Sequence, residues 1–362
     1  MIVTVVGARP NFVKAAPIHS AFCAAGVEHG ICHTGQHYDD TMAKVFFEDL
    51  GMPKPIVDLG VGSGTHAEQT AAAMIGLERF FSERQPQAVL VVGDVNSTLA
   101  AAIVAAKMGV YSAHVEAGLR SRDWTMPEEV NRVVTDTVVD LLLTPSEDAD
   151  RNLLSEGSAP DTIVRVGNVM IDALQQHLPA ARSLGVPARF GLRPQQYAVM
   201  TLHRPSNVDD VSVFAGILNA VATIARRLPV VFPIHPRTRA NAAAAGLTSL
   251  LDQTPGLLPL DPLGYLEFLS LTCEARLVLT DSGGLQEETT VLGIPCLTLR
   301  ENTERPVTIT QGTNRLVGSD PQTIIREAGR ALEQQPGLPH RVPELWDGHA
   351  AERIVDAVLA RL

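Results

Sequence analysis

The sequence contains few aromatic side chains and few cysteines, and both shortages exclude classes of protein. Aromatic residues make up 4% of the 362 residues. The four cysteines, Cys23, Cys32, Cys273 and Cys296, are scattered and form no Cys-x-x-Cys pair. Such spacing indicates neither a zinc site nor a disulfide framework. We expect reduced, buried thiols in a cytoplasmic protein.

The chain also lacks a surplus of basic residues and any long apolar run. It has 29 basic and 40 acidic residues, for a formal net charge of -11. This balance argues against general binding of nucleic acid or of an anionic membrane, although a local basic cleft still admits an anionic ligand. No apolar run is long enough to cross a bilayer, and the first residues lack the pattern of a signal peptide. We therefore expect neither a nucleic-acid nor a membrane partner.

Two further absences concern cofactors and metals. The glycine-rich residues 60–64 follow no clear strand and lack the dinucleotide fingerprint, so they indicate a mobile loop and not an NAD site. His114 and Glu116 could both ligate a metal, but no third ligand stands at a matching spacing. The same objection holds for His33 and His37, whose spacing Gly35 interrupts. We expect no metal site.

What the chain does contain is a regular alternation of short apolar strands and amphipathic helices. At 45% hydrophobic residues the chain is long enough and apolar enough for two cores. Alternation of this kind predicts parallel sheets with right-handed crossovers, and so an α/β fold. The predicted strands lie at residues 2–6, 89–92, 111–115, 141–144, 163–166, 197–202, 230–234, 257–260, 277–280 and 296–299.

The strand pattern restarts after Pro194, which divides the chain into two predicted domains. Residues 1–177 form the first domain, and residues 195–349 form the second. Residues 178–194 carry three prolines and weak periodicity, so they are predicted to be the linker. The helical residues 350–362 are expected to pack back on the first domain.

Two strand-to-helix junctions stand out as candidate anion sites. Residues 7–14 follow the first strand and include Arg9 and Lys14; residues 281–288 follow another apolar strand and begin Asp-Ser-Gly-Gly. Small residues at such a junction leave backbone N–H groups free at the positive end of a helix dipole. Two junctions suggest a diphosphate ligand held between two nucleotide-binding-type domains.

Carboxylates follow the strands of the first half. Asp94 stands at a strand tip, where it could face a ligand or cap a helix. Glu116 follows the next strand, and an acid or base role fits it because Gly118 lets a ligand approach. Glu128 lies in a predicted first helical turn, where a favourable dipole interaction explains it equally well.

Cations follow the strands of the second half. His203 and Arg204 close its first strand, and such a pair is costly to bury without a partner such as phosphate. Arg305 follows a later strand, where it could meet an anion or pair with Glu304.

Taken in order, these segments resemble the non-hydrolysing UDP-N-acetylglucosamine 2-epimerase family. The matching segments are residues 7–10 with Lys14, 34–37, 93–94, 114–120, 127–132, 203–204, 281–284 with 286–288, and 303–306. The resemblance implies two Rossmann-like doubly wound domains, as in many nucleotide-sugar glycosyltransferases (glycosyltransferase-B-like), with the substrate in the interdomain cleft. It also implies a homodimer.

The resemblance implies a chemistry and a set of residue roles. A base removes the C2 proton of the sugar while UDP leaves C1, which gives 2-acetamidoglucal; UDP then re-adds after C2 is protonated on the opposite face. Because UDP is retained, no external cofactor is expected. The implied catalytic residues are Asp94, Glu116, Glu128 and His203. The implied substrate-binding residues are Arg9, Lys14, Arg204, Phe268, Ser282, Gly283, Gly284, Glu288 and Arg305.

Some positions depart from the family pattern and keep alternatives open. Pro205 follows the His-Arg pair where many members have an acid, and residues 36–40 look more like members that act on modified sugars. One such relative converts a UDP-2,3-diacetamido-2,3-dideoxyglucuronate, but it tends to lack the Arg-Pro kept here at residues 305–306. We expect UDP-GlcNAc as the substrate, ahead of that uronate. A UDP-sugar glycosyltransferase and a non-catalytic UDP-sugar-binding protein are the other candidates.

Overall fold

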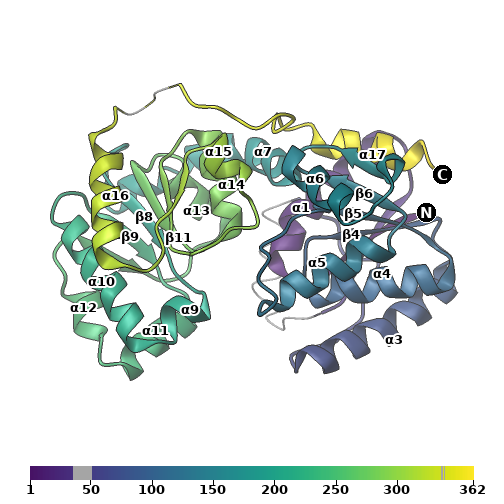
Figure 1. The fold of residues 1–362 in the computed structure, drawn as a ribbon, viewed down its shortest axis with the longest axis horizontal. Coiled ribbons are helices and arrows are strands. Elements are labelled where there is room, and N and C mark those ends of the chain that lie inside the picture. Colours follow the sequence, from purple (N-terminus) through teal and green to yellow (C-terminus); the bar gives the residue numbers. More distant parts are fainter. Residues whose placement is uncertain (36–50, 336, 338) are drawn as a thin grey trace. The chain divides into compact units, whose positions relative to one another are not determined.

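The computed structural model describes residues 1–35, 51–335, 337 and 339–362 and divides the chain into two units (Figure 1). Unit 1 comprises Met1–Gln175 and Glu344–Leu362, and unit 2 comprises Gln176–Pro343. Residues 178–194, predicted to be a linker, thus fall within unit 2. In the described part of the chain, no helix combines the length and the apolar character that a membrane span requires.

Unit 1 is a parallel sheet covered by helices on both faces. Its sheet has seven strands in the order β3-β2-β1-β4-β5-β6-β7. Its elements are β1 (Ile2–Val6), α1 (Arg9–Ala24), β2 (His29–His33), β3 (Val57–Asp58), α3 (His66–Arg84), β4 (Ala88–Val92), α4 (Asn96–Met108), β5 (Tyr111–Val115), α5 (Pro127–Val138), β6 (Leu141–Thr144), α6 (Glu147–Ser155), the 3₁₀ turn η1 (Pro160–Thr162), β7 (Ile163–Arg165), the start of α7 (Val169–Ser183), and α17 (Ala350–Leu359).

The two faces of this sheet form separate cores, because successive side chains of a strand point to opposite sides. In β4, Leu90 packs in the cluster that holds Phe22 of α1 and Ile354 of α17. Its neighbour Val91 packs in the other cluster, with Leu77 of α3 and residues of α4. A strand buried on both faces reads as a continuous apolar run, which explains why β4 could be predicted.

Unit 2 repeats this architecture with six parallel strands in the order β10-β9-β8-β11-β12-β13. Helices α10 and α16 cover one face, and α13 and α14 cover the other. Its elements after α7 are α8 (Val186–Arg189), β8 (Ala198–Thr201), α9 (Pro205–Val208), α10 (Val211–Ala225), β9 (Val230–Pro233), α11 (Pro236–Ala244), α12 (Thr248–Asp252), β10 (Leu257–Leu260), α13 (Tyr265–Thr272), β11 (Leu277–Thr280), α14 (Gly283–Leu292), β12 (Cys296–Thr298), α15 (Val307–Thr310), β13 (Asn314–Leu316) and α16 (Pro321–Glu333). The predicted class, two Rossmann-like doubly wound sheets, is confirmed.

Each sheet has one point where the strand order reverses. In unit 1 the neighbours β1 and β4 form this switch point, and in unit 2 they are β8 and β11. Crossovers leave the two strands in opposite directions, so the loops after their carboxyl ends open a crevice. Ligands of doubly wound sheets bind at this place, and the residues after these four strands define the candidate site.

The last helix of the chain belongs to unit 1, where it lies beside α1 (Figure 1). The buried carboxylate of Asp172 holds its start by accepting hydrogen bonds from Ala350 N at 3.1 Å and Ala351 N at 2.6 Å. Nearby, the buried Trp346 donates its indole N–H to Pro145 O at 2.9 Å. Burial raises the pKa of Asp172 to about 6, although these backbone hydrogen bonds oppose the shift.

The raised pKa of Asp172 predicts an unusual pH dependence of stability. The folded pKa exceeds the ordinary value of 3.8, so this group contributes stability below that value, and the contribution is lost as the pH rises through about 6. Asp172→Asn keeps an acceptor oxygen but does not titrate. We predict that the wild type gains stability relative to Asp172→Asn when the pH falls from about 7.5 to about 5.

Tryptophan fluorescence during urea unfolding measures this difference. The chain has two tryptophans, Trp124 and Trp346, and both lie in unit 1, so the signal reports on this unit alone. A difference between the two proteins that stays constant with pH, or that shrinks towards low pH, would contradict the prediction.

Candidate active site

At the switch point of unit 1, the side chain of Asn11 joins the loops after β1 and β4. Its Oδ1 accepts from Gly7 N at 3.3 Å and Ala8 N at 3.1 Å, and its Nδ2 donates to Val92 O at 2.8 Å. This contact was not predicted, because an Asn in a helix start has no sequence signal that separates such a bridge from an ordinary cap. The side chain of Arg9 lies outside the described part of the chain, so its expected role stays a prediction.

Glu116 has the geometry of a functional carboxylate. Its backbone φ is +73°, a left-handed conformation that is strained for a residue with a side chain and that clusters at functional sites. The residue is 5% exposed, and its Oε2 forms an ion pair with Lys14 Nζ. Its Oε1 is buried and has no hydrogen-bond partner among the residues that the structure describes. One oxygen is thus held by a cation while the other remains available.

Gly93 brings the loop after β4 against this pair. A Cβ at Gly93 would lie 3.5 Å from Glu116 Oε2 and 3.5 Å from Lys14 Nζ, and the glycine has a φ of +70°. A Cβ here would be in ordinary van der Waals contact with the ion pair, so the left-handed φ is what favours glycine. Lys14, predicted to bind substrate, therefore contacts Glu116 directly; its expected contact with substrate stays a prediction.

Asp94 follows Gly93 and is oriented by α5. Arg132 donates to its Oδ2 from Nε at 3.0 Å and from Nη2 at 2.6 Å, and Asn131 Nδ2 donates to Asp94 O at 2.9 Å. The carboxylate side chain of Asp94 is 31% exposed. Asp94 and Glu116 thus occupy adjacent loops at one edge of the sheet.

Glu128 lies half-buried in the first turn of α5, immediately before Glu129. Glu129 accepts from Ser121 N at 2.9 Å and Arg122 N at 2.8 Å, and Arg132 Nη1 donates to it at 2.7 Å. The same arginine contacts Asp94. Glu129 and Arg132 therefore connect the start of α5, which carries Glu128, to the loop after β5 and to the loop that carries Asp94.

At the switch point of unit 2, the buried Asp281 orients the residues after β8. Its carboxylate accepts from His203 N at 3.0 Å and Arg204 N at 2.8 Å, and it pairs with His203 Nδ1 at 2.9 Å. Burial favours a raised pKa for Asp281, but the hydrogen bond and charge of His203 and the backbone hydrogen bonds lower it overall. The role of Asp281 was not predicted, because its partner His203 lies 78 residues away in the sequence.

His203 faces a pocket of about 280 Å³. Its side chain is 49% exposed, and Phe268 and Ser282 also line this pocket. Helix α14 begins at Gly283 with Ser282 as its N-cap, which presents free backbone N–H groups at a positive helix end. The pocket thus combines an apolar wall with anion-binding groups.

Two charged side chains leave no room for a side chain at position 283. A Cβ at Gly283 would lie 2.6 Å from Arg305 Nη1 and 2.8 Å from Glu304 Oε1. Arg305 is buried and donates to Glu287 and to Glu304, each at 2.5 Å. Of the two predicted alternatives for Arg305, the structure has the pairing with Glu304; a ligand contact stays a prediction.

Glu288 is a buried residue of α14. Burial and the neighbouring Glu287 raise its pKa to about 7, while a hydrogen bond from Tyr265 lowers it. The Tyr265 hydroxyl lies 3.4 Å from Glu288 Oε1. A carboxyl group that is partly protonated near pH 7 can both accept from hydroxyls and donate to them, which fits the substrate-binding role that the family resemblance implies.

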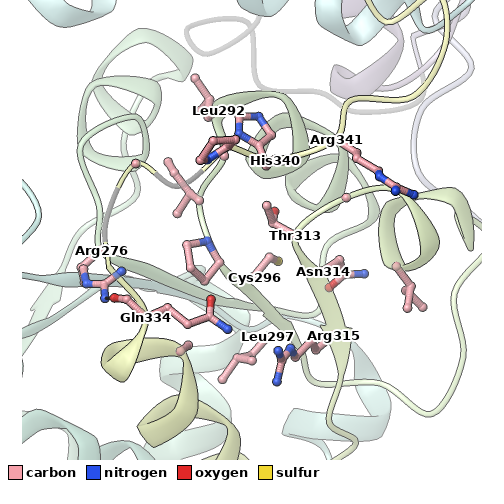
Figure 2. A pocket seen from close by; sticks show the side chains of 18 of the residues that line it. Arg276, Leu292, Cys296, Leu297, Thr313, Asn314, Arg315, Gln334, His340 and Arg341 are labelled. Carbon is pink, nitrogen blue, oxygen red and sulfur yellow. Dashed lines mark hydrogen bonds between the residues drawn. The ribbon is translucent and has the colours of Figure 1, made fainter.

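A larger pocket of about 840 Å³ lies at the opposite edge of the same sheet. Figure 2 shows Arg276, Cys296, Thr313 and Arg315 around it. These residues lie at or just before the amino ends of β11, β12 and β13, whereas ligands of doubly wound sheets bind beyond the carboxyl ends. This pocket is therefore not part of the candidate site.

The fold and the two groups of residues define a nucleotide-sugar enzyme of the α/β class. One unit presents carboxylates at its switch point, and the other presents a helix start beside a His–Asp pair. Residues 22–359 match the family model of UDP-N-acetylglucosamine 2-epimerase, and the chain belongs to this family. The resemblance drawn from the sequence is confirmed.

Two relatives whose names give different substrates share the same sequence identity with this chain. The UDP-N-acetylglucosamine 2-epimerase of Methanocaldococcus jannaschii is 41% identical over 356 residues, which cover 97% of this chain and 96% of that protein. The UDP-2,3-diacetamido-2,3-dideoxy-D-glucuronate 2-epimerase of Pseudomonas aeruginosa is 41% identical over 369 residues, which cover 100% of this chain and 99% of that protein. Identity alone does not choose between their substrates.

A solved structure agrees over the same length. The crystal structure of the M. jannaschii UDP-GlcNAc 2-epimerase in complex with UDP-GlcNAc and UDP matches with a TM-score of 0.91 at 40% identity. The match covers 99% of each chain.

Gly118 supports the turn that carries Glu116, and its replacement should destabilise unit 1. Its φ is +80°, and a Cβ would lie 2.5 Å from Ala149 O. Gly109 has a similar φ of +67°, but nothing lies within 4 Å of its Cβ position. We predict that Gly109→Ala costs about 1–2 kcal/mol for the left-handed conformation alone, and that Gly118→Ala costs about 2–5 kcal/mol because a backbone clash is added.

The same tryptophan signal during urea unfolding compares the two variants, with Gly109→Ala as the matched control. Equal losses of unfolding free energy would mean that the close approach of Gly118 to α6 is not a constraint.

Proposed function

We propose that this protein inverts C2 of a UDP-2-acetamido sugar, with UDP-GlcNAc and UDP-ManNAc as the interconverted pair. The observation that carries the proposal is Glu116: a strained, buried carboxylate with one oxygen paired to Lys14 and the other without a partner among the described residues. A base that acts at carbon needs such an available oxygen. Membership of the family supports the same reaction.

In the proposed reaction, a carboxylate of unit 1 takes the proton from C2. The electrons of the C2–H bond form the C1–C2 double bond, and the C1–O bond breaks with its electron pair going to the diphosphate. UDP and 2-acetamidoglucal result. Protonation of C2 on the opposite face and return of the UDP oxygen to C1 complete the inversion. Atoms and electrons balance without a co-reactant.

Inversion needs an acid or base on each face of C2, and unit 1 offers three carboxylates. Glu116 and Asp94 each form an ion pair with a cation, Lys14 and Arg132 respectively. Glu128 is the third candidate, at the start of α5. We assign the proton transfers to these residues without assigning the face that each serves.

Unit 2 is the proposed UDP-binding unit. His203, Arg204 and the backbone of residues 282–284 would hold the diphosphate, since a helix start and nearby cations suit that charge. Phe268 would pack near uracil, and Glu288 would accept from the ribose hydroxyls. The family resemblance implies that Arg9 also stabilises the departing diphosphate, and that Lys14 and Arg305 line the polar end of the site. A cytoplasmic homodimer is the expected setting.

A second candidate substrate is the UDP-diacetamido uronate of the P. aeruginosa relative, which is as similar as the M. jannaschii one. Arg305 and Pro306, which that kind of relative tends to lack, favour UDP-GlcNAc. Incubation of the protein with each sugar nucleotide alone, with NMR detection of the C2 epimer, separates the two. Turnover of the uronate alone would reject our substrate, and turnover of neither would reject the function.

The proposed role of Glu116 predicts a large loss of turnover in Glu116→Gln. The amide keeps the shape but cannot take a proton, so kcat should fall about 100- to 10,000-fold, the usual contribution of a positioned acid or base. UDP binding, measured by calorimetry, should change little, because unit 2 is unaltered. Glu78→Gln, an exposed change of the same kind in α3, is the matched control. A Glu116→Gln enzyme with wild-type kcat would remove the assignment.

A further inference from the structure

One buried histidine of unit 1 is among neither the predicted catalytic residues nor the predicted substrate-binding residues. His114 lies in β5, is 1% exposed, and has an acceptor at each ring nitrogen. Its Nδ1 lies 2.6 Å from Asp136 Oδ1, and its Nε2 lies 2.8 Å from Gly93 O. A carbonyl oxygen can only accept, so Nε2 carries a hydrogen.

Asp136 is the second member of this cluster. Burial favours a raised pKa for Asp136, but the charge and hydrogen bond of His114, together with Arg120 and Gly118 N, lower it overall. Asp136 is thus the anionic partner of this cluster. Arg120 Nη1 lies 2.8 Å from Asp136 Oδ2, and Arg120 also pairs with Glu156 at 2.6 Å. The buried carboxylate is therefore paired.

The cluster joins the two loops that carry the proposed acid and base groups. His114 holds the carbonyl of Gly93, which directly precedes Asp94. Asp136 Oδ2 accepts from Gly118 N at 3.0 Å, two residues after Glu116. The peptide that precedes Asp94 and the peptide between Ala117 and Gly118 are thus both hydrogen-bonded to the buried His114–Asp136 pair.

We propose that His114 is a positioning residue, which sets Asp94 relative to Glu116 by donating a hydrogen bond to the carbonyl of Gly93. This inference rests on the proposed function, because it takes Asp94 and Glu116 as the proton-transfer groups. His114 does not touch the substrate. Its effect comes from geometry, and a displacement of a catalytic group by about 1 Å can cost about 100-fold in rate.

Two amide replacements separate the hydrogen bond to Gly93 from the contact with Asp136. The side-chain N–H of Gln reaches the position of histidine Nε2, whereas that of Asn reaches only the position of Nδ1. His114→Gln can therefore donate to Gly93 O, and His114→Asn can donate only to Asp136.

We expect kcat of His114→Asn to fall about 100-fold, with KM within about threefold of the wild type, and kcat of His114→Gln to fall no more than about 10-fold. Urea unfolding followed by tryptophan fluorescence checks that unit 1 is folded in both variants. His349→Asn, at an exposed histidine of the same unit, is the control and should leave kcat unchanged. Equal kcat values in the Gln and Asn variants, or a loss that falls on KM, would overturn the proposal.

A second measurement needs no turnover. Nitrogen-15 NMR of the ligand-free protein labelled at histidine should show one ring, absent from His114→Gln, whose Nε2 carries a hydrogen. A ring at this position without a hydrogen on Nε2 would overturn the proposed hydrogen bond. If the wild type epimerises none of the sugar nucleotides, the proposed function fails and the positioning role fails with it, while this spectrum still reports whether the cluster exists.

Discussion

The reversal of strand order at the centre of each sheet is the constraint on which the rest of the structure depends. At β1 and β4, and again at β8 and β11, neighbouring parallel strands send their chains to opposite faces. The loops beyond these strand ends cannot pack against each other in the way that successive loops on one face do. Polar residues gather at that position: Asn11, Asp94, His203 and Asp281 each follow one of these strands, and Glu116 follows β5 beside them.

At this position, cations orient carboxylates in unit 1, whereas carboxylates orient cationic groups in unit 2. In unit 1, the cations Lys14 and Arg132 orient the carboxylates Glu116 and Asp94. In unit 2, the carboxylate of Asp281 orients the cation-forming His203, and Glu287 holds Arg305. A buried charge is stable only with a partner, so each functional group requires its counter-ion nearby. The proposed proton removal from carbon and the proposed retention of a diphosphate need these opposite polarities.

The sequence predicted those parts of the fold in which one physical requirement dominates. Strands such as β4 are buried on both faces and read as apolar runs, whereas β2, with the sequence His-Gly-Ile-Cys-His, does not. Gly30 of β2 leaves room for Ile56, whose Cδ1 would lie 2.4 Å from a Cβ there. Residues 178–183 of helix α7 were predicted to belong to the linker because of Pro179, which the helix nonetheless contains. Both were missed because tertiary packing outweighed the local signal.

The residues of the candidate site also divide into those that the sequence could locate and those that it could not. Asp94, Glu116, His203 and residues 282–284 follow strand ends, which a sequence pattern can locate. Asn11, Asp136 and Asp281 act through partners that are distant in sequence, so only the folded chain identifies them. Glu128 remains a prediction, since a first-turn glutamate satisfies the helix dipole whether or not it transfers a proton.

The central claim is that inversion proceeds by removal and return of a proton at C2. The most direct test is incubation with UDP-GlcNAc in deuterated water, without added cofactor, followed by NMR of the sugar product. The account predicts UDP-ManNAc that carries deuterium at C2, because the returning proton comes from a carboxyl group that exchanges with solvent. Epimerised product that retains protium at C2 would contradict it.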